Sequence, residues 1–139
     1  MAYLLDTCVV SEFTKPRPSA SVDRWVAGVP DASQLISVLT LGELEKGVRK
    51  LAAGQRRGAL ERWLADLHLR IVDRILPVDA RVALEWGRIS AREEAAGRPM
   101  PVIDALIGAT ALVHGHTVVT RNKSDIARSG AKIFDPWSG

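Results

Sequence analysis

Short apolar runs alternate along this chain with longer segments in which apolar residues recur every three or four positions. The runs are too short for helices and rich in strand-forming residues, so they predict strands. They occupy residues 3–5, 35–39, 75–78, 117–120 and, as a candidate last strand, 132–134. No two-residue hairpin joins them, and helical segments lie between them. The pattern predicts an α/β fold: one domain over residues 1–139, with a mainly parallel central sheet of four to five strands and helices on both faces.

The intervening segments carry the start and stop signals of helices. Ser19 or Ser21 can cap one helix, and Asp79 can cap another over residues 80–96. Residues 102–113 are apolar almost all round, which predicts a central, buried helix. Further helices are expected within residues 8–14, 22–28, 40–53, 60–67 and 124–128.

Composition narrows the class of protein. The 139 residues are the size of one ordinary domain, and a hydrophobic content of 47% suffices for one core. No apolar run is long enough to cross a bilayer, and no basic-then-apolar leader begins the chain. The single cysteine, Cys8, excludes an internal disulfide and favours a cytoplasmic protein. A net charge of +3 favours acidic partners without identifying one.

Three acidic residues each follow a different predicted strand, near its carboxyl end. They are Asp6 after the first strand, Glu43 after the second and Asp125 after the strand that ends at Thr120. Taken singly, each has an ordinary structural interpretation. Asp6 can cap a helix, Glu43 can be a favourable charge in the first turn of a helix, and Asp125 can be a cap or a surface acid. In parallel α/β sheets, however, ligands bind at the carboxyl ends of the strands.

A fourth acid, Asp104, is harder to explain structurally. It lies in the first turn of the most apolar helix, which Pro101 is expected to open at its first position. Gly108 and Ala111 follow on the same side of the helix and would leave room beside it. An ionised carboxylate that enters a core costs several kcal/mol unless it is paired or binds a metal. The helix dipole recovers only about 0.3–1 kcal/mol of that cost.

If the strands are neighbours, the four acids meet in one pocket. At an effective dielectric constant of about 20, each pair of charges roughly 4–8 Å apart costs about 2–4 kcal/mol. The sum over all pairs rivals the roughly 5–15 kcal/mol stability of a domain. The site must therefore protonate, be screened by water or hold cations. Oxygen ligands without cysteine or histidine favour Mg²⁺ or Mn²⁺ over Zn²⁺.

The charge on the rest of the chain suggests a substrate class. Taking the four acids out of a net charge of +3 leaves +7 on the remainder. A basic body around an acidic, metal-loaded pocket suits a polyanion, because the body attracts its phosphates. One metal ion can lower the pKa of a bound water, and a second can stabilise the leaving oxygen. The combination predicts hydrolysis of phosphodiester bonds.

Four motifs occur in an order that resembles one known family. They are LLDTCVVSE at residues 4–12, TLGEL at 40–44, PVIDALIGATA at 101–111 and VVTRNKSD at 118–125. Together they resemble a PIN domain, specifically a VapC-type toxin of bacterial type II toxin–antitoxin pairs, over nearly the whole chain. The resemblance implies an endoribonuclease that depends on Mg²⁺ or Mn²⁺, is neutralised by a small cognate antitoxin protein and is usually dimeric.

The resemblance also implies roles for single residues. The acids match the family's metal-binding and catalytic positions: Asp6, Glu43 and Asp104 the invariant-type ones, and Asp125 a more variable fourth. The neighbouring polar residues match supporting positions that can hydrogen-bond to a carboxylate or to water on the metal: Thr7, Thr120 and, in the T-R-N loop, Asn122. Cys8 departs from the family, many members of which have asparagine there. A thiol is a poorer hydrogen-bond partner, so Cys8 is not expected to bind metal.

Other conspicuous residues have ordinary interpretations. Without a histidine nearby in the sequence, Cys8 is expected to be a small buried thiol rather than a nucleophile. His114 and His116 flank the end of a helix. An imidazole there interacts favourably with the helix dipole, and this interpretation is preferred to a pair of metal ligands. A run of five cations is expected to form a solvated helix face, with an RNA track as the alternative; it comprises Lys46, Arg49, Lys50, Arg56 and Arg57.

Two other functions remain open at this stage. One is a non-catalytic PIN-like binding module; the other is an aspartate-based phosphatase or phosphoacceptor domain, which usually needs a second acid where Thr7 follows Asp6. The expected partners are an RNA substrate, an antitoxin and a second copy of the chain, with no membrane. The antitoxin is expected to lay an apolar segment against the helices around Trp25 and residues 44–51, and to direct an arginine or lysine towards the acids.

Overall fold

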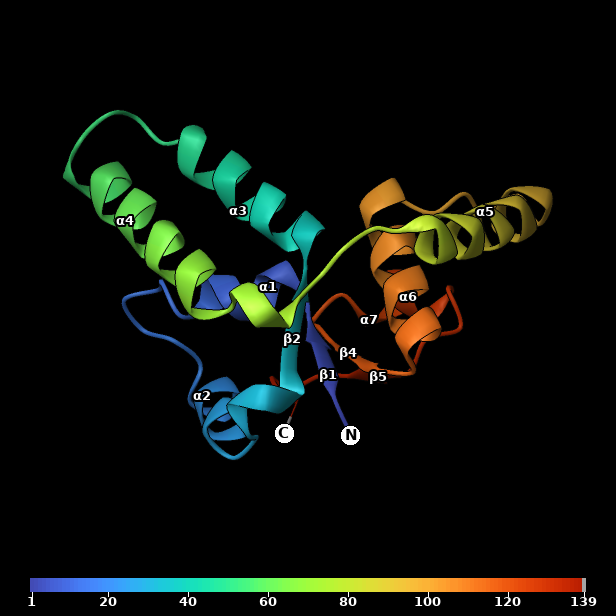
Figure 1. Cartoon of the computed structure of the whole chain (residues 1–139), viewed down its shortest axis with the longest axis horizontal. Helices are drawn as coiled ribbons and strands as arrows, with labels where there is room; N and C mark the ends of the chain where they lie inside the picture. The colour runs from blue at the N-terminus through green and yellow to red at the C-terminus, as the bar shows by residue number, and fades with distance from the viewer. Residues whose placement is uncertain (139) are drawn as a thin grey trace.

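A five-stranded parallel sheet forms the centre of the computed structural model, which describes residues 1–138 (Figure 1). The middle strand is β1 (Tyr3–Leu5), which lies between β2 (Gln34–Ser37) and β4 (Thr117–Val119). The edges are β3 (Ile75–Leu76) and β5 (Ile133–Phe134). All the strand pairings are parallel, which confirms the predicted fold class and brings every carboxyl strand end to one edge of the sheet.

Helices fill the connections between strands, and two predicted caps are confirmed, although the helix expected within residues 60–67 begins at Gln55 and ends at Arg70. The Ser19 hydroxyl and the Asp79 carboxylate each accept a hydrogen bond from a backbone N–H in the first turn of their helix, as expected. In residues 1–138 no helix is both long and apolar enough to cross a membrane. The helices are α1 (Thr7–Glu12), α2 (Ala20–Ala27), α3 (Val38–Arg49), α4 (Gln55–Arg70), α5 (Ala80–Ala95), α6 (Val102–His114) and α7 (Lys123–Ala127), with short 3₁₀ turns at Asp31–Ser33 and Val72–Arg74.

Different helices bury the two faces of the sheet. Leu5, Ile36 and Val119 belong to a core that they share with α1 to α4. Leu4 and Val118 point to the opposite face, where they pack with α6 and α7. Because successive strand residues face opposite sides, these neighbours reach separate cores. The predicted helices on both faces are therefore confirmed.

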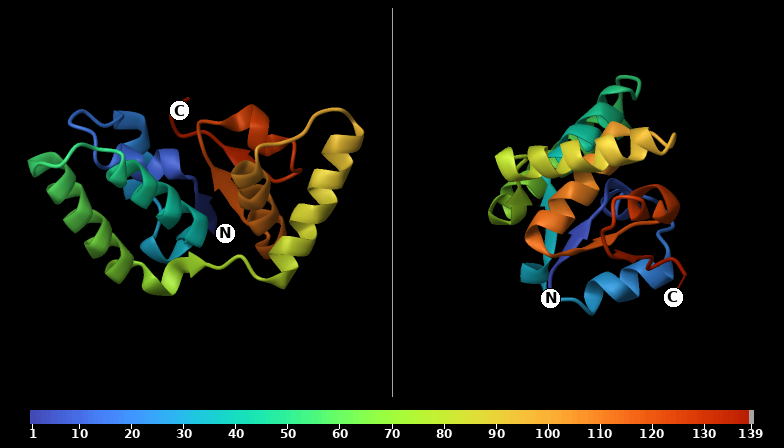
Figure 2. Two further views of the ribbon diagram at one scale, coloured as in Figure 1. Left: turned by 90° about the horizontal axis from the view of Figure 1, so that it is seen from above. Right: turned by 90° about the vertical axis from the view of Figure 1, so that its right-hand side faces the viewer.

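One helix packs on another helix rather than on the sheet. Val82 and Ile89 of α5 contact Ala105 and Ala109 of α6 in a third apolar cluster. The central, buried position predicted for α6 is confirmed, since it lies between the sheet and α5. Figures 1 and 2 show two helix pairs, α3–α4 and α5–α6, on either side of the carboxyl edge of the sheet.

The second strand ends earlier than its apolar pattern predicts. It stops at Ser37, whose hydroxyl accepts a hydrogen bond of 3.0 Å from the N–H of Leu39, so Val38 and Leu39 already belong to α3. Glu43 consequently lies in the second turn of α3, not in the first, and the first turn carries no acid. Pro101 likewise serves as the N-cap of α6 instead of its first residue.

The surface expected to receive an antitoxin is only partly available. Leu44 and Val48 of α3 are 7% and 6% exposed and belong to the core between α3 and the sheet. The ring of Trp25 packs edge-on against Tyr3, with 5.0 Å between ring centroids. Leu44 and Val48 therefore pack inward and are not available to a partner, and docking of an antitoxin against the helices around Trp25 and residues 44–51 stays a prediction.

The small residues after Asp104 do not leave free space. A Cβ built on Gly108 would lie 2.2 Å from Oγ and 2.4 Å from Cβ of Ser129, which is itself buried. The Ser129 hydroxyl donates a 2.6 Å hydrogen bond to the carbonyl of Ile126. Gly108 therefore permits the close approach of the segment after α7, and the room that Gly108 was expected to leave is filled by Ser129.

Gly108→Ala should destabilise the fold by about 1–3 kcal/mol, because the added methyl group must displace Ser129. Gly87→Ala on α5 is the matched control, since a Cβ there meets nothing within 4 Å. Replacing glycine by alanine in an open helical position stabilises by roughly 0.5–1 kcal/mol. Urea unfolding measures both free energies. Equal midpoints for the two variants would contradict the packing described for Gly108.

Candidate active site

Three of the four predicted acids meet at the carboxyl edge of the sheet. Asp6 directly follows β1, Glu43 comes from α3 and Asp104 from the first turn of α6. They line one pocket of about 480 Å³, completed by Thr7, Cys8, Arg121 and Asn122. The expected convergence is therefore observed for Asp6, Glu43 and Asp104, together with the predicted supporting residues Thr7 and Asn122.

Asp6 is held from two directions. The hydroxyl of Thr120 donates a buried hydrogen bond of 2.7 Å to Oδ2, and the backbone N–H of Thr7 donates one of 2.8 Å to Oδ1. Asp6 is therefore both the N-cap of α1 and a wall of the pocket. The two interpretations of this residue are not alternatives, since one side chain satisfies both.

The other two carboxylates also take a hydrogen bond from a supporting residue. The Thr7 hydroxyl donates to Oε1 of Glu43 over 2.5 Å, and the buried Thr40 hydroxyl lies 3.5 Å from the Thr7 oxygen. The side-chain amide of Asn122 donates a 3.2 Å hydrogen bond to Oδ2 of Asp104. Each carboxylate is thus oriented by a residue from a different segment of the chain.

Mutual repulsion among the acids is visible at Asp104. Its pKa is raised above the ordinary value by burial first, and then by the negative charges of Asp6, Asp125 and Glu43. The hydrogen bond from Asn122 lowers the pKa and offsets part of this effect. The crowding of charge expected from the sequence therefore exists in the folded chain.

Asp125 stands at the margin of the site. It lies in the first turn of α7, does not line the pocket, and its side chain is 43% exposed. Its nearest cation is Arg128, whose Nη2 lies 3.8 Å from Oδ1. It is close enough to raise the pKa of Asp104, but the structure does not bring it into contact with the other three acids.

Cys8 belongs to the pocket wall, although no chemical role was expected for it. Its sulfur lies 3.7 Å from Oδ2 of Asp6 and accepts a 3.5 Å hydrogen bond from the backbone N–H of Arg121. Burial, the largest effect, raises the pKa of the thiol, and the negative charge of Asp6 adds to it. The protonated form is favoured, which agrees with an inert thiol rather than a nucleophile.

Arg121 is a residue of the site that sequence reasoning missed. It lines the pocket, and its guanidinium carbon lies 4.3 Å from the ring centroid of Trp137. The turn that carries Trp137 is fastened by Asp135, which accepts a 2.8 Å hydrogen bond from the Trp137 N–H and lies 3.2 Å from Nζ of Lys123. The only signal in the sequence was the position of Arg121 between Thr120 and Asn122.

The donor chemistry of the pocket suits a hard divalent cation. Glu43 is held through Oε1 and Asp104 through Oδ2, so within residues 1–138 the second oxygen of each receives no hydrogen bond. Such carboxylate oxygens are the ligands that Mg²⁺ and Mn²⁺ prefer. In the same part of the chain, no three Asp, Glu, His or Cys side chains lie close enough to share an ion as they stand.

Most of the sequence matches a known family model. The family model described as PIN domain matches residues 3–131. The chain belongs to the PIN-domain family. This confirms the family that the four sequence motifs resembled, and it accounts for the parallel sheet with acids at its carboxyl edge.

Relatives of this PIN domain carry names from toxin systems. It is 30% identical over 135 residues to the VapC ribonuclease Y4jK of Sinorhizobium fredii and 33% identical over 135 residues to the toxin FitB of Neisseria gonorrhoeae. The aligned regions cover 96% of this chain in both cases, and 96% and 97% of the relatives. The crystal structure of FitAcB from Neisseria gonorrhoeae superposes with a TM-score of 0.90 at 32% identity, over 97% of this chain and 98% of that chain. Ribonucleases of the family generally use divalent metal ions.

Asp104→Asn should raise the free energy of unfolding of the metal-free PIN domain at pH 7. The raised pKa of Asp104 means that its charged form is disfavoured in the folded state, whereas asparagine stays neutral and can still accept from Asn122. As pH falls through the pKa of Asp104, the wild-type carboxyl takes up a proton, and the unfavourable free energy of its charged form in the folded state disappears. The advantage of the variant should then shrink, as urea unfolding across that pH range would measure.

Asp66→Asn provides the control for this experiment. Asp66 is exposed on α4 and does not line the pocket, so removing its charge should change stability by less than about 0.5 kcal/mol. If Asp104→Asn unfolds at a lower urea concentration than the wild type at pH 7 without metal, the charge of Asp104 does not destabilise the folded state, and the expected repulsion among the acids is contradicted.

Proposed function

We propose that this PIN domain is an endoribonuclease that depends on Mg²⁺ or Mn²⁺ and hydrolyses RNA phosphodiester bonds. The observation that carries the proposal is the meeting of Asp6, Glu43 and Asp104 in one pocket, with the pKa of Asp104 raised by burial and by the other acids. Such crowding is unfavourable for the fold and has no evident structural purpose. A site for cations explains why these charges are kept together.

Within this proposal the residues have distinct tasks. Asp6, Glu43 and Asp104 hold the cation, and Asp125 adds negative charge from the rim. When bound, a divalent cation lowers the pKa of water and neutralises charge on the phosphate that is attacked. The donors from Thr120, Thr7 and Asn122 keep one oxygen of each carboxylate engaged, so that the opposite oxygens of Glu43 and Asp104 are left for the cation.

The proposed biological setting is a toxin–antitoxin pair. The named relatives include a VapC ribonuclease and a toxin, and both align over almost the whole chain. We propose that a small antitoxin protein neutralises this chain, and that the chain forms a homodimer within a larger complex. Location in the cytoplasm, expected from the single cysteine, stays a prediction. Cleavage should be lost when the cognate antitoxin is added, and full activity in that complex would contradict this part of the proposal.

Asp6→Asn, Glu43→Gln and Asp104→Asn should each reduce RNA cleavage by more than about 100-fold, since loss of even an outer partner of a metal ligand costs 10–100-fold. The assay incubates the antitoxin-free chain with a mixed RNA pool and Mg²⁺, Mn²⁺ or EDTA. EDTA should abolish cleavage, and Asp66→Asn should cleave like the wild type. Asp125→Asn should have a smaller effect than the other three, because Asp125 lies outside the pocket.

The outcomes separate the competing functions. Cleavage that survives substitution of Asp6 and Asp104 would show that another site or a contaminant is responsible. If no RNA is cut, calorimetric titration with Mn²⁺ decides: binding that is lost in Asp104→Asn supports a nuclease with a narrow target. No Mn²⁺ binding by the wild type would favour the non-catalytic binding module.

Thr120→Val should lower cleavage by about 10–100-fold, because Asp6 loses the donor that orients Oδ2. Thr120→Ser should restore most of the activity, since it keeps the hydroxyl. Thr110→Val is the matched control: Thr110 is equally buried, but its hydroxyl donates to the carbonyl of Leu106 within α6. Equal activity of the Thr120→Val and Thr110→Val variants would show that the Thr120 hydroxyl has no role in cleavage.

A further inference from the structure

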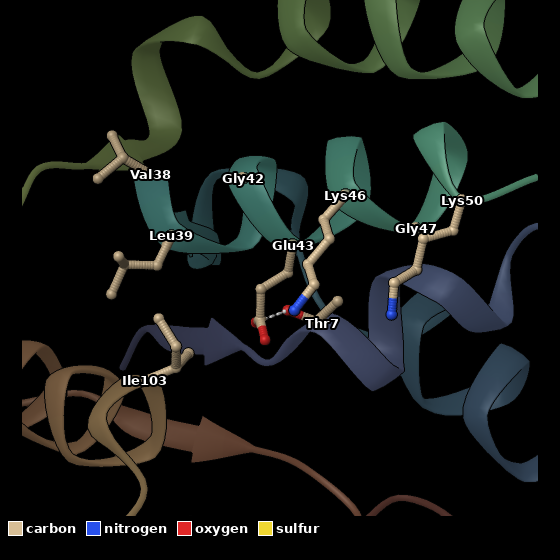
Figure 3. Close-up of a pocket in the computed structure, with 9 residues that line it drawn as sticks. All are labelled: Thr7, Val38, Leu39, Gly42, Glu43, Lys46, Gly47, Lys50 and Ile103. Carbon is tan, nitrogen blue, oxygen red and sulfur yellow. Dashed lines mark hydrogen bonds between the residues drawn. The ribbon is translucent and has the colours of Figure 1, made fainter.

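A groove of about 530 Å³ runs from the acidic pocket along α3 (Figure 3). Thr7 and Glu43 line both hollows, so the groove and the pocket are adjacent. The groove is apolar at one end, where Val38, Leu39 and Ile103 line it. It is basic at the other end, where Lys46 and Lys50 line it, and Gly42 and Gly47 complete the lining. A ligand that reaches the acids from the basic end of the groove therefore passes two lysines.

The helical repeat places these lysines on the same side as the acid. Lys46 and Lys50 follow Glu43 at steps of three and four residues, and Figure 3 shows all three side chains projecting to one side of α3. Successive turns separate Lys46 from Lys50 by about 6 Å along the helix axis. A Cβ built on Gly42 or Gly47 meets nothing within 4 Å, so the space beside the lysines is open.

The structure distinguishes these two lysines from the other cations of the basic run. Arg49 pairs with Glu45 at 2.7 Å, and Arg57 pairs with Glu61 at 2.9 Å. Neither Lys46 nor Lys50 forms an ion pair with any residue in the range 1–138. Arg56 also has no ion pair within residues 1–138, but Lys46 and Lys50 are the unpaired cations of the run that line the groove.

We propose that Lys46 and Lys50 bind the phosphate backbone of the RNA strand beside the bond to be cut. The inference rests on the proposed ribonuclease function and extends it to a substrate-binding groove. A polyanion that approaches Asp6, Glu43 and Asp104 meets negative charge, and two unpaired ammonium groups next to Glu43 offset that repulsion. Charge complementarity therefore favours an RNA strand over a protein segment as the occupant. Lys46 and Lys50 are positioning residues, because they bind the strand and leave the reaction to the acids.

The test measures the salt dependence of RNA binding. A fluorescein-labelled single-stranded RNA of random sequence is titrated, in Mg²⁺, with the Asp104→Asn variant and with the same variant carrying Lys46→Gln and Lys50→Gln. Each phosphate contact to a single strand contributes about 0.7 to the slope of log K against log salt. The double substitution should reduce that slope by about 1.4, and Lys46→Arg with Lys50→Arg should retain it. Arg49→Gln removes one positive charge, from an ion-paired position of α3, and should change the slope by much less than the roughly 0.7 expected for each lysine.

Steady-state cleavage by the otherwise wild-type chain gives the second measurement. The Lys46→Gln, Lys50→Gln chain should show a KM raised by about tenfold or more with kcat nearly unchanged, because the lysines hold the strand and the acids perform the reaction. Both lysines are exposed, so unfolding midpoints should match the wild type.

Two results would overturn the inference, and they are distinguishable. If the wild type cleaves RNA and the glutamine variants keep its KM and salt slope, the ribonuclease function stands and the groove serves another occupant, such as a protein segment. If the wild type neither binds nor cleaves RNA with Mg²⁺ or Mn²⁺, the proposed function fails and the inference fails with it.

Discussion

Repulsion among carboxylates at the carboxyl edge of the sheet is the constraint on which the rest of this site depends. Left to themselves, such groups would turn away from each other into water, because each close pair is unfavourable. Here rigid elements bring them together, and a hydrogen bond from a different segment orients each one: Thr120 to Asp6, Thr7 to Glu43 and Asn122 to Asp104. The folded chain thereby holds an excess of negative charge that protons, cations or basic side chains of a partner would relieve.

The features that the sequence predicted are those for which burial leaves a strong local signal. β1 and β4 are covered on both faces, so they appear as short unbroken apolar runs between polar segments. α6 is apolar almost all round because it lies between the sheet and α5. An acid at the end of such a strand, like Asp6, or at the start of such a helix, like Asp104, has few structural explanations. The fold class and the three converging acids were therefore predictable, as were the helix caps at Ser19 and Asp79.

What the sequence could not predict depends on direction and on distant contacts. Arg49 and Lys50 are adjacent cations in the sequence, yet one is paired with Glu45 and the other lines the groove. Arg121 stacks on Trp137, a contact that no local pattern encodes. Gly108 suggested empty space beside Asp104, whereas it accommodates Ser129 from a later segment. Glu43 was placed one turn too early, because Val38 and Leu39 favour a strand by composition but follow a serine that caps a helix.

The order of the strands has a consequence for biosynthesis. β4 enters the sheet beside β1, although β2 and β3 precede it in the chain, and the Thr120 hydroxyl that orients Asp6 comes from a position 114 residues later. A growing chain that has emerged from the ribosome only as far as α5 carries Asp6 and Glu43, but it lacks both Asp104 and Thr120. The site is therefore incomplete until the chain has been synthesised through Thr120 and β4 can pair with β1.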